Sequence, residues 1–320
     1  MTTPPAALEP GAVVGGRYAI RSLIAEGGMG AVWEAVQAHT NRVVAVKVLH
    51  ARWANNDVTV QRFIQEARIV AELDHPNIAQ IIDGGTDRRY GVYSVFERLY
   101  GGSLYEWIVE HERLDLLQIE RWIVPVMHGL TAAHERGVVH RDVKPENIYL
   151  ALQADGSMHS KLLDFGISKV GSSTALVRTR TGTLVGTPSY MSPEQTMGDR
   201  ALDHRADQWS VAVVLYECLA GRLPFEGGSL PEVVAGVLHG TPTPLAQVDG
   251  SVPSALAGAV MRALAKNPAD RFASMRSFAS EVHDACRVAR TTLAHAETQS
   301  QPRDAAPLAA VIATPRRPRP

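Results

Sequence analysis

The chain has 320 residues, of which 45% are hydrophobic and 20% charged, and its formal net charge at pH 7 is −1. This length suffices for two modest lobes or for one large domain with a tail, and the composition is that of a globular protein. The near-neutral charge argues against a nucleic-acid binder, which usually carries a basic excess. The two cysteines, Cys218 and Cys286, do not form a disulfide framework, which favours a reducing cytoplasm.

Neither end of the chain has the pattern of a targeting or spanning segment. Residues 1–16 are rich in Pro, Ala and Gly without a basic stretch before an apolar core, which predicts disorder rather than a signal peptide. Residues 291–320 are rich in Pro, Ala and Arg without periodicity, which predicts a second disordered tail. No apolar run approaches the ~20 residues of a transmembrane helix, so we expect no membrane segment within the chain.

Between these ends, strand-like patterns come first and helical patterns follow. Strands are predicted at 18–23, 31–36, 42–49 and 91–99, with one helix at 58–73 between the last two. Further helices are predicted at 103–111, 117–136, 206–220, 230–239, 254–264 and 273–288, with one hairpin at 147–163. This order predicts an α+β fold with a small β-rich lobe over residues 17–98, which includes one helix, and a larger, mainly helical lobe over residues 99–290.

A glycine-rich stretch, EGGMGAV at 26–32, lies between the first two predicted strands. Glycines at 27, 28 and 30 allow a backbone to lie close to phosphate oxygens, where a Cβ would hold it away. Glycine-rich hairpin turns are common, however, so this stretch alone favours an ordinary turn over a phosphate-binding loop.

Two charged residues interrupt apolar patterns. Lys47 lies in the middle of the apolar strand VVAVKVL, and Glu66 lies on the apolar stripe of the helix at 58–73, between Phe63 and Ala67. Buried charges require partners, so each is the obvious partner of the other. The alternative is that both side chains reach solvent separately, which explains either residue alone better than both together.

The densest signal is HRDVKPEN at 140–147, a polar loop between a predicted helix and the hairpin. The triplet Asp164-Phe165-Gly166 directly follows the second strand of that hairpin. Asp142, Asn147 and Asp164 therefore bring oxygen atoms to the ends of one hairpin, and hard oxygen ligands suit Mg²⁺ that arrives with a nucleotide phosphate. Charged loops are usually only solvated, but chance does not explain these triplets in this order.

Together, these motifs resemble those of the eukaryotic-like (Hanks-type) protein kinases, and most of all their bacterial Ser/Thr branch. The resemblance spans about residues 17–288 and implies the two-lobed kinase fold. It implies that Asp142 accepts the proton of the substrate hydroxyl, that Lys144 steadies the transferred phosphoryl group, and that Lys47 holds phosphates and pairs with Glu66. Asn147 and Asp164 would bind Mg²⁺, with Mn²⁺ as an alternative metal. ATP would be bound by Ile24, Ala25, Glu26, Gly27, Gly28, Met29, Gly30, Val32, Ala45, Lys47, Phe96, Glu97, Leu99 and Tyr149.

The resemblance continues through GTPSY at 186–190 and SPE at 192–194, segments that position a peptide substrate in relatives. It implies that Arg271 is the buried partner of Glu194 and that Asp207 braces the catalytic loop. Lys144 and Thr187 follow the Ser/Thr pattern rather than that of tyrosine kinases, and small-molecule phosphotransferases usually lack the GTPSY and SPE segments. The chain is therefore expected to phosphorylate Ser and Thr on protein substrates and on itself.

The segment SSTALVRTRTGTLVGT at 172–187 is rich in hydroxyl groups and has no acidic residue. It is either a plain flexible loop or a self-phosphorylated loop that an arginine orders through the added charge. The second hypothesis names Thr179 and Thr181 as the main phosphorylation sites.

Two residues depart from the family pattern. Ala25 replaces the first glycine of the usual loop, and Tyr149 lies where relatives place an aliphatic residue below the adenine. These departures motivate an alternative, a pseudokinase that acts as a scaffold, although the lysine, the catalytic aspartate and the metal-binding aspartate are all present. The resemblance further suggests a homodimer through the small lobe, no nucleic-acid partner, and a cytoplasmic location, either alone or as part of a longer membrane-anchored protein.

Overall fold

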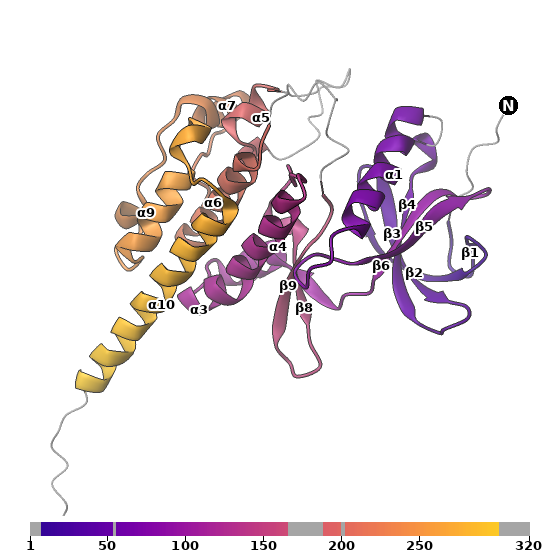
Figure 1. Cartoon of the computed structure of the whole chain (residues 1–320), viewed down its shortest axis with the longest axis horizontal. Helices are drawn as coiled ribbons and strands as arrows, with labels where there is room; N and C mark the ends of the chain where they lie inside the picture. The colour runs from indigo at the N-terminus through magenta and orange to yellow at the C-terminus, as the bar shows by residue number, and fades with distance from the viewer. Residues whose placement is uncertain (1–7, 54–55, 166–187, 200–201, 301–320) are drawn as a thin grey trace, which may run out of the picture.

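The computed structural model of the chain describes residues 8–53, 56–165, 188–199 and 202–300, with side chains in the last helix up to residue 292. A β-rich lobe and a larger helical lobe lie beside each other and are joined near residues 97–101 (Figure 1). The predicted α+β organisation in two lobes is thus confirmed.

The small lobe is built on a six-stranded antiparallel sheet in the order β1-β2-β3-β4-β6-β5. Its strands are β1 (Val13–Val14), β2 (Tyr18–Glu26), β3 (Gly30–Gln37), β4 (Val43–Leu49), β5 (Ile81–Asp87) and β6 (Gly91–Glu97). β-branched residues at Val44, Val46 and Val48 are all buried in β4, which is enclosed between β3 and β6.

The helix of the small lobe, α1 (Asp57–Ala71), follows the short 3₁₀ helix η1 (Ala51–Trp53) and packs against β5 and β6. Its N-cap is Asn56, whose side chain accepts a hydrogen bond from the Thr59 amide. Phe63 and Val70 on its apolar stripe are buried, so the helix presents one face to the sheet.

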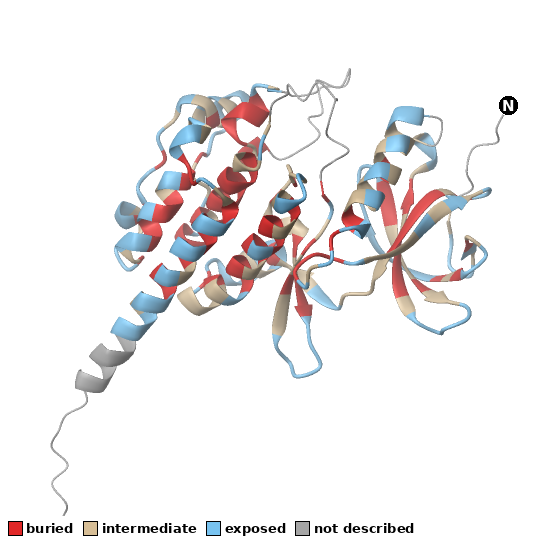
Figure 2. Cartoon of the chain, in the orientation of Figure 1, coloured by how far each residue is buried: buried red, intermediate tan, exposed pale blue. Residues whose placement is uncertain are grey.

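The large lobe surrounds a helix that is buried on every side. In α6 (Arg205–Ala220), fourteen of sixteen residues are buried, which an amphipathic surface helix would not allow (Figure 2). The surrounding helices are α2 (Leu104–His111), α3 (Leu116–Gln118), α4 (Val124–Glu135), α5 (Pro193–Thr196), α7 (Leu230–His239), α8 (Leu245–Val248), α9 (Ser254–Ala263) and α10 (Met275–Ser300), with 3₁₀ turns η3 (Pro145–Asn147), η5 (Pro188–Tyr190) and η6 (Pro268–Asp270).

A second, three-stranded sheet lies where the two lobes meet (Figure 1). It consists of β7 (Gly101–Ser103), β8 (Ile148–Leu152) and β9 (Met158–Leu162), in that order. The predicted hairpin at 147–163 is β8 and β9, and it turns where the sequence predicted, around Gly156 with its positive φ of 82°. This sheet places the loops before β8 and after β9 side by side.

Two boundaries differ from the prediction. Residues 8–16 are not disordered, because β1 pairs with β2 and Val14 is fully buried. The C-terminal helix does not end near residue 288–290 but continues to Ser300, and Arg290 pairs with Glu120 of the large lobe. Residues 1–7 and 301–320 lie outside the described part of the chain.

The single helix predicted at 117–136 is divided. It begins as α3, continues through a π-helical segment, η2 (Ile119–Ile123), and becomes α4, whose first turn contains Pro125. Pro125 has no N–H to continue an α-helical ladder, and the wider π-helical turn, in which the Val124 amide donates to the Ile119 carbonyl, accommodates it. No helix among the described residues combines the length and the apolar character that crossing a membrane requires.

Candidate active site

The loop at 140–147 is fixed from below by Asp207, which is fully buried in the first turn of α6. Its carboxylate accepts hydrogen bonds from the backbone amides of His140 and Arg141, both at 2.8 Å, and from Nε2 of His134 at 2.7 Å. Burial alone raises the pKa of Asp207, but these donors outweigh it and hold the pKa below its ordinary value. A charged carboxylate therefore braces the loop, as the resemblance implied.

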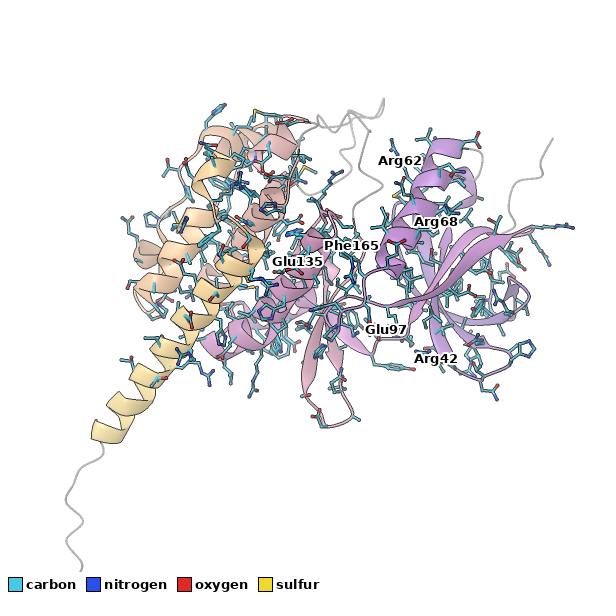
Figure 3. All side chains as sticks on the ribbon, viewed as in Figure 1. Arg42, Arg62, Arg68, Glu97, Glu135 and Phe165 are labelled. Atoms are coloured by element: carbon cyan, nitrogen blue, oxygen red, sulfur yellow. The ribbon has the colours of Figure 1, made fainter. Side chains whose placement is uncertain are left out.

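His140 is fully buried and uses both ring nitrogens. Nε2 donates to the Leu163 carbonyl at 2.9 Å, so Nδ1 is the acceptor for the Asp142 amide at 3.2 Å. Burial lowers the pKa of His140, which keeps the ring neutral. The ring also packs against Phe165, with centroids 4.6 Å apart, at the junction of the two lobes (Figure 3). The histidine thereby links the loop before β8 to the segment after β9.

Asp142 and Asn147 form one hydrogen-bonded unit. The side-chain amide nitrogen of Asn147 donates to the backbone carbonyl of Asp142 at 2.8 Å and to Oδ2 of the Asp142 carboxylate at 3.2 Å. Nζ of Lys144 lies 3.8 Å from the same carboxylate oxygen. The Asp142 side chain is 23% exposed, so this carboxylate is oriented by the protein and still reachable from outside. The sequence analysis assigned these three residues to one site, and in the structure their side chains are neighbours.

Lys47 forms an ion pair with Asp164. Its Nζ is 2.6 Å from Oδ1 of Asp164, while Glu66 lines the same small cavity behind Phe96. Burial lowers the pKa of Lys47, but the charges of Asp164 and Glu66 outweigh it and raise the pKa above its ordinary value. The predicted pairing of Lys47 with Glu66 in an active state stays a prediction.

The backbone at Asp164 is unusual, with a φ of 41°, and its side chain is 47% exposed. Positive φ at a non-glycine residue costs energy and is common at functional sites. Partial desolvation of the carboxyl raises the pKa of Asp164, but the ammonium group of Lys47 outweighs this and holds the pKa below its usual range. The group is therefore an ionised carboxylate, and it lines the apolar cavity between the lobes.

An apolar cavity lies between the lobes, with β3 and β4 on one side and β8 on the other. Eight of the residues predicted to bind ATP line it: Ile24, Val32, Ala45, Lys47, Phe96, Glu97, Leu99 and Tyr149. Ala79, Arg98 and Leu163 line it too, and the sequence prediction missed them. Ala79 and Leu163 are unremarkable apolar residues in sequence, whereas Arg98 follows Glu97 directly and was the neighbour most open to prediction.

Two features define the floor and the connecting edge of this cavity. The hydroxyl of Tyr149 donates to the Gly101 carbonyl at 2.8 Å, so the ring is held across the floor of the cavity. Burial raises the pKa of the Tyr149 hydroxyl. At the edge, the Glu97 amide donates to the Gln80 carbonyl at 3.0 Å, and the Glu97 carboxylate pairs with Lys161 at 2.7 Å (Figure 3). The connection between the lobes is thus fixed from both sides.

The glycine-rich loop joins β2 and β3 above this cavity. A Cβ at Gly30 would lie 2.3 Å from the Val48 carbonyl oxygen, so only glycine fits there. A Cβ at Gly28 would meet nothing within 4 Å, so the backbone there borders open space. Ala25 pairs with Val32 and is not among the residues of positive φ, which explains why a side chain is tolerated at this position.

The segment after the undescribed residues 166–187 is tied to the large lobe. Arg271, whose side chain is 0% exposed, forms a bidentate pair with Glu194 at 2.7 and 2.9 Å, as predicted. The neighbouring Gln195 donates from Nε2 to the Arg141 carbonyl at 2.9 Å, a contact that the sequence did not predict. Thr179 and Thr181, the predicted phosphorylation sites, lie outside the described residues.

The oxygen-bearing groups of the site suit a divalent hard cation. Asn147 uses its amide nitrogen for Asp142, so its carbonyl oxygen is the atom left for another ligand, and Asp164 supplies an ionised carboxylate. In the part of the chain that is described, no group of three or more His, Cys, Asp or Glu side chains could hold a metal by itself. Two protein oxygens together with nucleotide phosphates are a set that Mg²⁺ commonly takes.

Comparisons with known proteins agree with this geometry. A model of the protein kinase domain family matches residues 18–284. The chain is 36% identical over 317 residues to the serine/threonine-protein kinase pkn3 of Myxococcus xanthus, which covers 98% of this chain and 57% of that protein. It is 38% identical over 263 residues to the serine/threonine-protein kinase PknL of Mycobacterium tuberculosis, which covers 82% of this chain and 64% of that protein.

A solved structure shares the arrangement of both lobes. The crystal structure of the Mycobacterium tuberculosis PknI kinase domain aligns with a TM-score of 0.68 at 28% identity and covers 87% of this chain and 100% of that chain. The chain spans 57% of the length of the first of these two relatives and 64% of the length of the second.

Proposed function

The chain belongs to the protein kinase domain family, and from this premise we propose that it transfers the γ-phosphoryl group of ATP to serine and threonine hydroxyls of proteins. The names of its curated relatives support the Ser/Thr class. The observation that carries the proposal is the position of Asp142, which is held by Asn147 and by the braced backbone of the loop within 3.8 Å of a lysine ammonium group.

We propose that Asp142 orients the substrate hydroxyl and takes up its proton. As the hydroxyl oxygen bonds to the γ-phosphorus, the bond from that phosphorus to the β-phosphate oxygen breaks and ADP leaves. Lys144, next to the Asp142 carboxylate, would meet the charge on the transferred phosphoryl group, and Lys47 would meet the phosphates that remain on ADP. Because Lys47 has a raised pKa, it is charged at neutral pH, as this task requires.

The nucleotide is proposed to lie with its base in the cavity between the lobes. Val32 and Ala45 would cover the adenine from above, Tyr149 would support it from below, and the backbone of Glu97 and Leu99 would bind its edge. The glycine-rich loop would cover the phosphates, where the open space beside Gly28 admits a phosphate oxygen. Asn147 and Asp164 would hold Mg²⁺, or Mn²⁺ in its place, and the ion supplies charge neutralisation to the phosphates when bound.

Regulation is proposed to follow from self-phosphorylation at Thr179 and Thr181. The Nε atom of Arg141 is buried and has no hydrogen-bond partner among the described residues, which supports a role for this arginine in meeting an added phosphate. Both free cysteines are buried, which is compatible with the proposed cytoplasmic setting. A homodimer through the small lobe remains a proposal from resemblance alone.

The test is transfer of label from γ-labelled ATP in the presence of Mg²⁺, to the chain itself and to a basic protein substrate. The control is Asp142→Asn, which keeps the shape of the side chain and an oxygen that can accept from Asn147 but cannot take a proton. We expect label on serine or threonine in the parent chain, at Thr179 or Thr181 by mass spectrometry, and at least a ~100-fold lower rate in the variant. Binding of ATP without any transfer would favour the pseudokinase scaffold instead.

A further inference from the structure

The glycine-rich loop is held by side chains that come from η1, the short 3₁₀ helix after β4. Nη2 of Arg52 donates to the Gly28 carbonyl at 2.7 Å, and the indole Nε1 of Trp53 donates to the same oxygen at 3.2 Å. The guanidinium of Arg52 also lies over the Trp53 ring, 6.0 Å from its centroid, so the two donors support each other. A carbonyl at the tip of the loop thus accepts two side-chain hydrogen bonds, one of them from a cation.

The carbonyls on both sides of Gly28 are held by His50. Its ring Nε2 lies 2.9 Å from the Gly27 carbonyl and must carry the hydrogen, because a carbonyl oxygen can only accept. Its backbone amide donates to the Met29 carbonyl at 3.0 Å. Three successive carbonyls of the loop therefore face the segment at 50–53.

The direction of these carbonyls fixes the direction of the loop amides. In a trans peptide the C=O of one residue and the N–H of the next point to opposite sides of the backbone, and no cis peptide occurs among the described residues. The amides of Gly28 and Met29 therefore point away from His50 and Arg52, which occupy the other side of the loop. Amides directed together to one side are what an anion-binding loop requires.

The segment at 50–53 is also continuous with the strand that carries Lys47. Lys47 is paired with Val32 across β3 and β4, and Leu49 is paired with Gly30 at the end of the loop. Two residues of β4 and the segment beyond it therefore set both the position of the lysine and the position of the loop. A shift of this segment would move both groups that face the phosphates.

We propose that His50, Arg52 and Trp53 are positioning residues, which hold the glycine-rich loop with its amides directed at the nucleotide phosphates. The proposal rests on the proposed function, because it assigns the phosphates to the side of the loop opposite these three residues. Their role is to lower the energetic cost of ordering the loop when ATP binds. None of the three would need to touch the nucleotide.

The first test uses the full chain without nucleotide. Hydrogen exchange is measured at the amides of Gly27 and His50, which are bonded to loop carbonyls at 2.9 and 3.0 Å. In Arg52→Ala and Trp53→Phe, which remove one donor each, we expect exchange to be roughly two- to tenfold faster, the effect of losing one hydrogen bond. Arg52→Lys, which can still donate, should restore much of the protection.

The second test measures ATP affinity and kinetics of the same variants. We expect Kd and KM for ATP to rise roughly two- to tenfold in Arg52→Ala, with a smaller change in kcat and no change in KM for the protein substrate. The control is Arg42→Ala, because Arg42 adjoins the turn at the opposite end of the β3–β4 hairpin (Figure 3) and should alter neither exchange nor affinity.

The outcomes separate this inference from the proposed function. Unchanged exchange in both Arg52→Ala and Trp53→Phe would refute the loop contacts, and faster exchange with unchanged ATP affinity would refute the positioning role. A parent chain that binds ATP without transferring phosphate would count against the proposed function. A weaker affinity of Arg52→Ala for ATP would in that case still support the positioning role.

Discussion

Replacing Glu194 with glutamine should lower the free energy of unfolding by about 3 kcal/mol, because it leaves the guanidinium of Arg271 buried without its counter-charge. The side chain of Arg271 is 0% exposed and that of Glu194 is 11% exposed, so water cannot replace the lost carboxylate. Removing one partner of a buried pair typically costs about 3–5 kcal/mol. The lower end of this range applies, because glutamine keeps one oxygen as an acceptor.

Other contacts of the guanidinium limit the loss further. Arg271 also donates to three backbone carbonyls, at 2.9 Å to Ala265, at 2.9 Å to Arg205 and at 3.2 Å to Lys266. These bonds persist in the glutamine variant and hold the guanidinium in place. The expected cost is therefore that of one uncompensated charge, without collapse of the surrounding structure.

The assay is urea denaturation of the parent chain, Glu194→Gln, Arg271→Met and the double variant. We expect the double variant to lose less than the sum of the two single losses, since it leaves no unpaired charge in the interior. Asp203→Asn is the matched control, because Asp203 is 50% exposed in its pair with Arg205 and should cost less than about 1 kcal/mol. A loss below about 1 kcal/mol for Glu194→Gln, or full additivity in the double variant, would refute the reasoning.

Two further predictions concern single side chains of the site. Because the pKa of His140 is lowered in the folded chain, the unfolded chain binds a proton below about pH 6.5 that the folded chain does not, and the free energy of unfolding should fall as pH drops below about 6.5. Denaturation at a series of pH values should show that the free energy of unfolding changes less steeply with pH in His140→Asn. An equally steep change in the variant would contradict the burial argument. Tyr149→Phe removes the hydrogen bond to the Gly101 carbonyl and should lower the free energy of unfolding by about 1 kcal/mol. The KM for ATP should change little, since the ring still forms the cavity floor. A large rise in this KM would show that the hydroxyl itself takes part in binding ATP.

The elements that carry the motifs could be predicted because their hydrophobic patterns are strong. The apolar run of β4, the stripe of α1 and the hairpin of β8 and β9 all lie where their periodicity indicated. The strand β5 was missed because Gly84 and Gly85 interrupt it and its pattern is only half buried. β1 was missed because it has two residues, too few for a period, and it is held by pairing with β2.

The contacts of the site differ in how far local sequence could reveal them. The resemblance implied both the pair of Glu194 with Arg271 and the bracing role of Asp207. The local sequence could not predict them, because the partners lie 77 residues apart in the first case and 67 residues apart, for Asp207 and His140, in the second. The contact of Lys47 with Asp164 was missed, although both residues were assigned to the site. The carboxylates of Asp164 and Glu66 both act on one ammonium group, and the sequence does not mark that the segment after β9 carries Asp164 to Lys47.

The contacts of the glycine-rich loop show why such details escape sequence reasoning. A carbonyl group is present in every residue, so a sequence does not mark which carbonyls accept side-chain hydrogen bonds. Arg52 and Trp53 lie beyond the strand that pairs with β3, in a polar stretch that predicts only a connection to the next helix. Their role becomes visible once the β3–β4 pairing sets Leu49 opposite Gly30, because this register brings the residues that follow Leu49 alongside the loop that precedes Gly30. The register of one hairpin thus determines which groups can direct the phosphate-facing amides, and a variant that shifted that register would be expected to lose both the loop contacts and the position of Lys47 together.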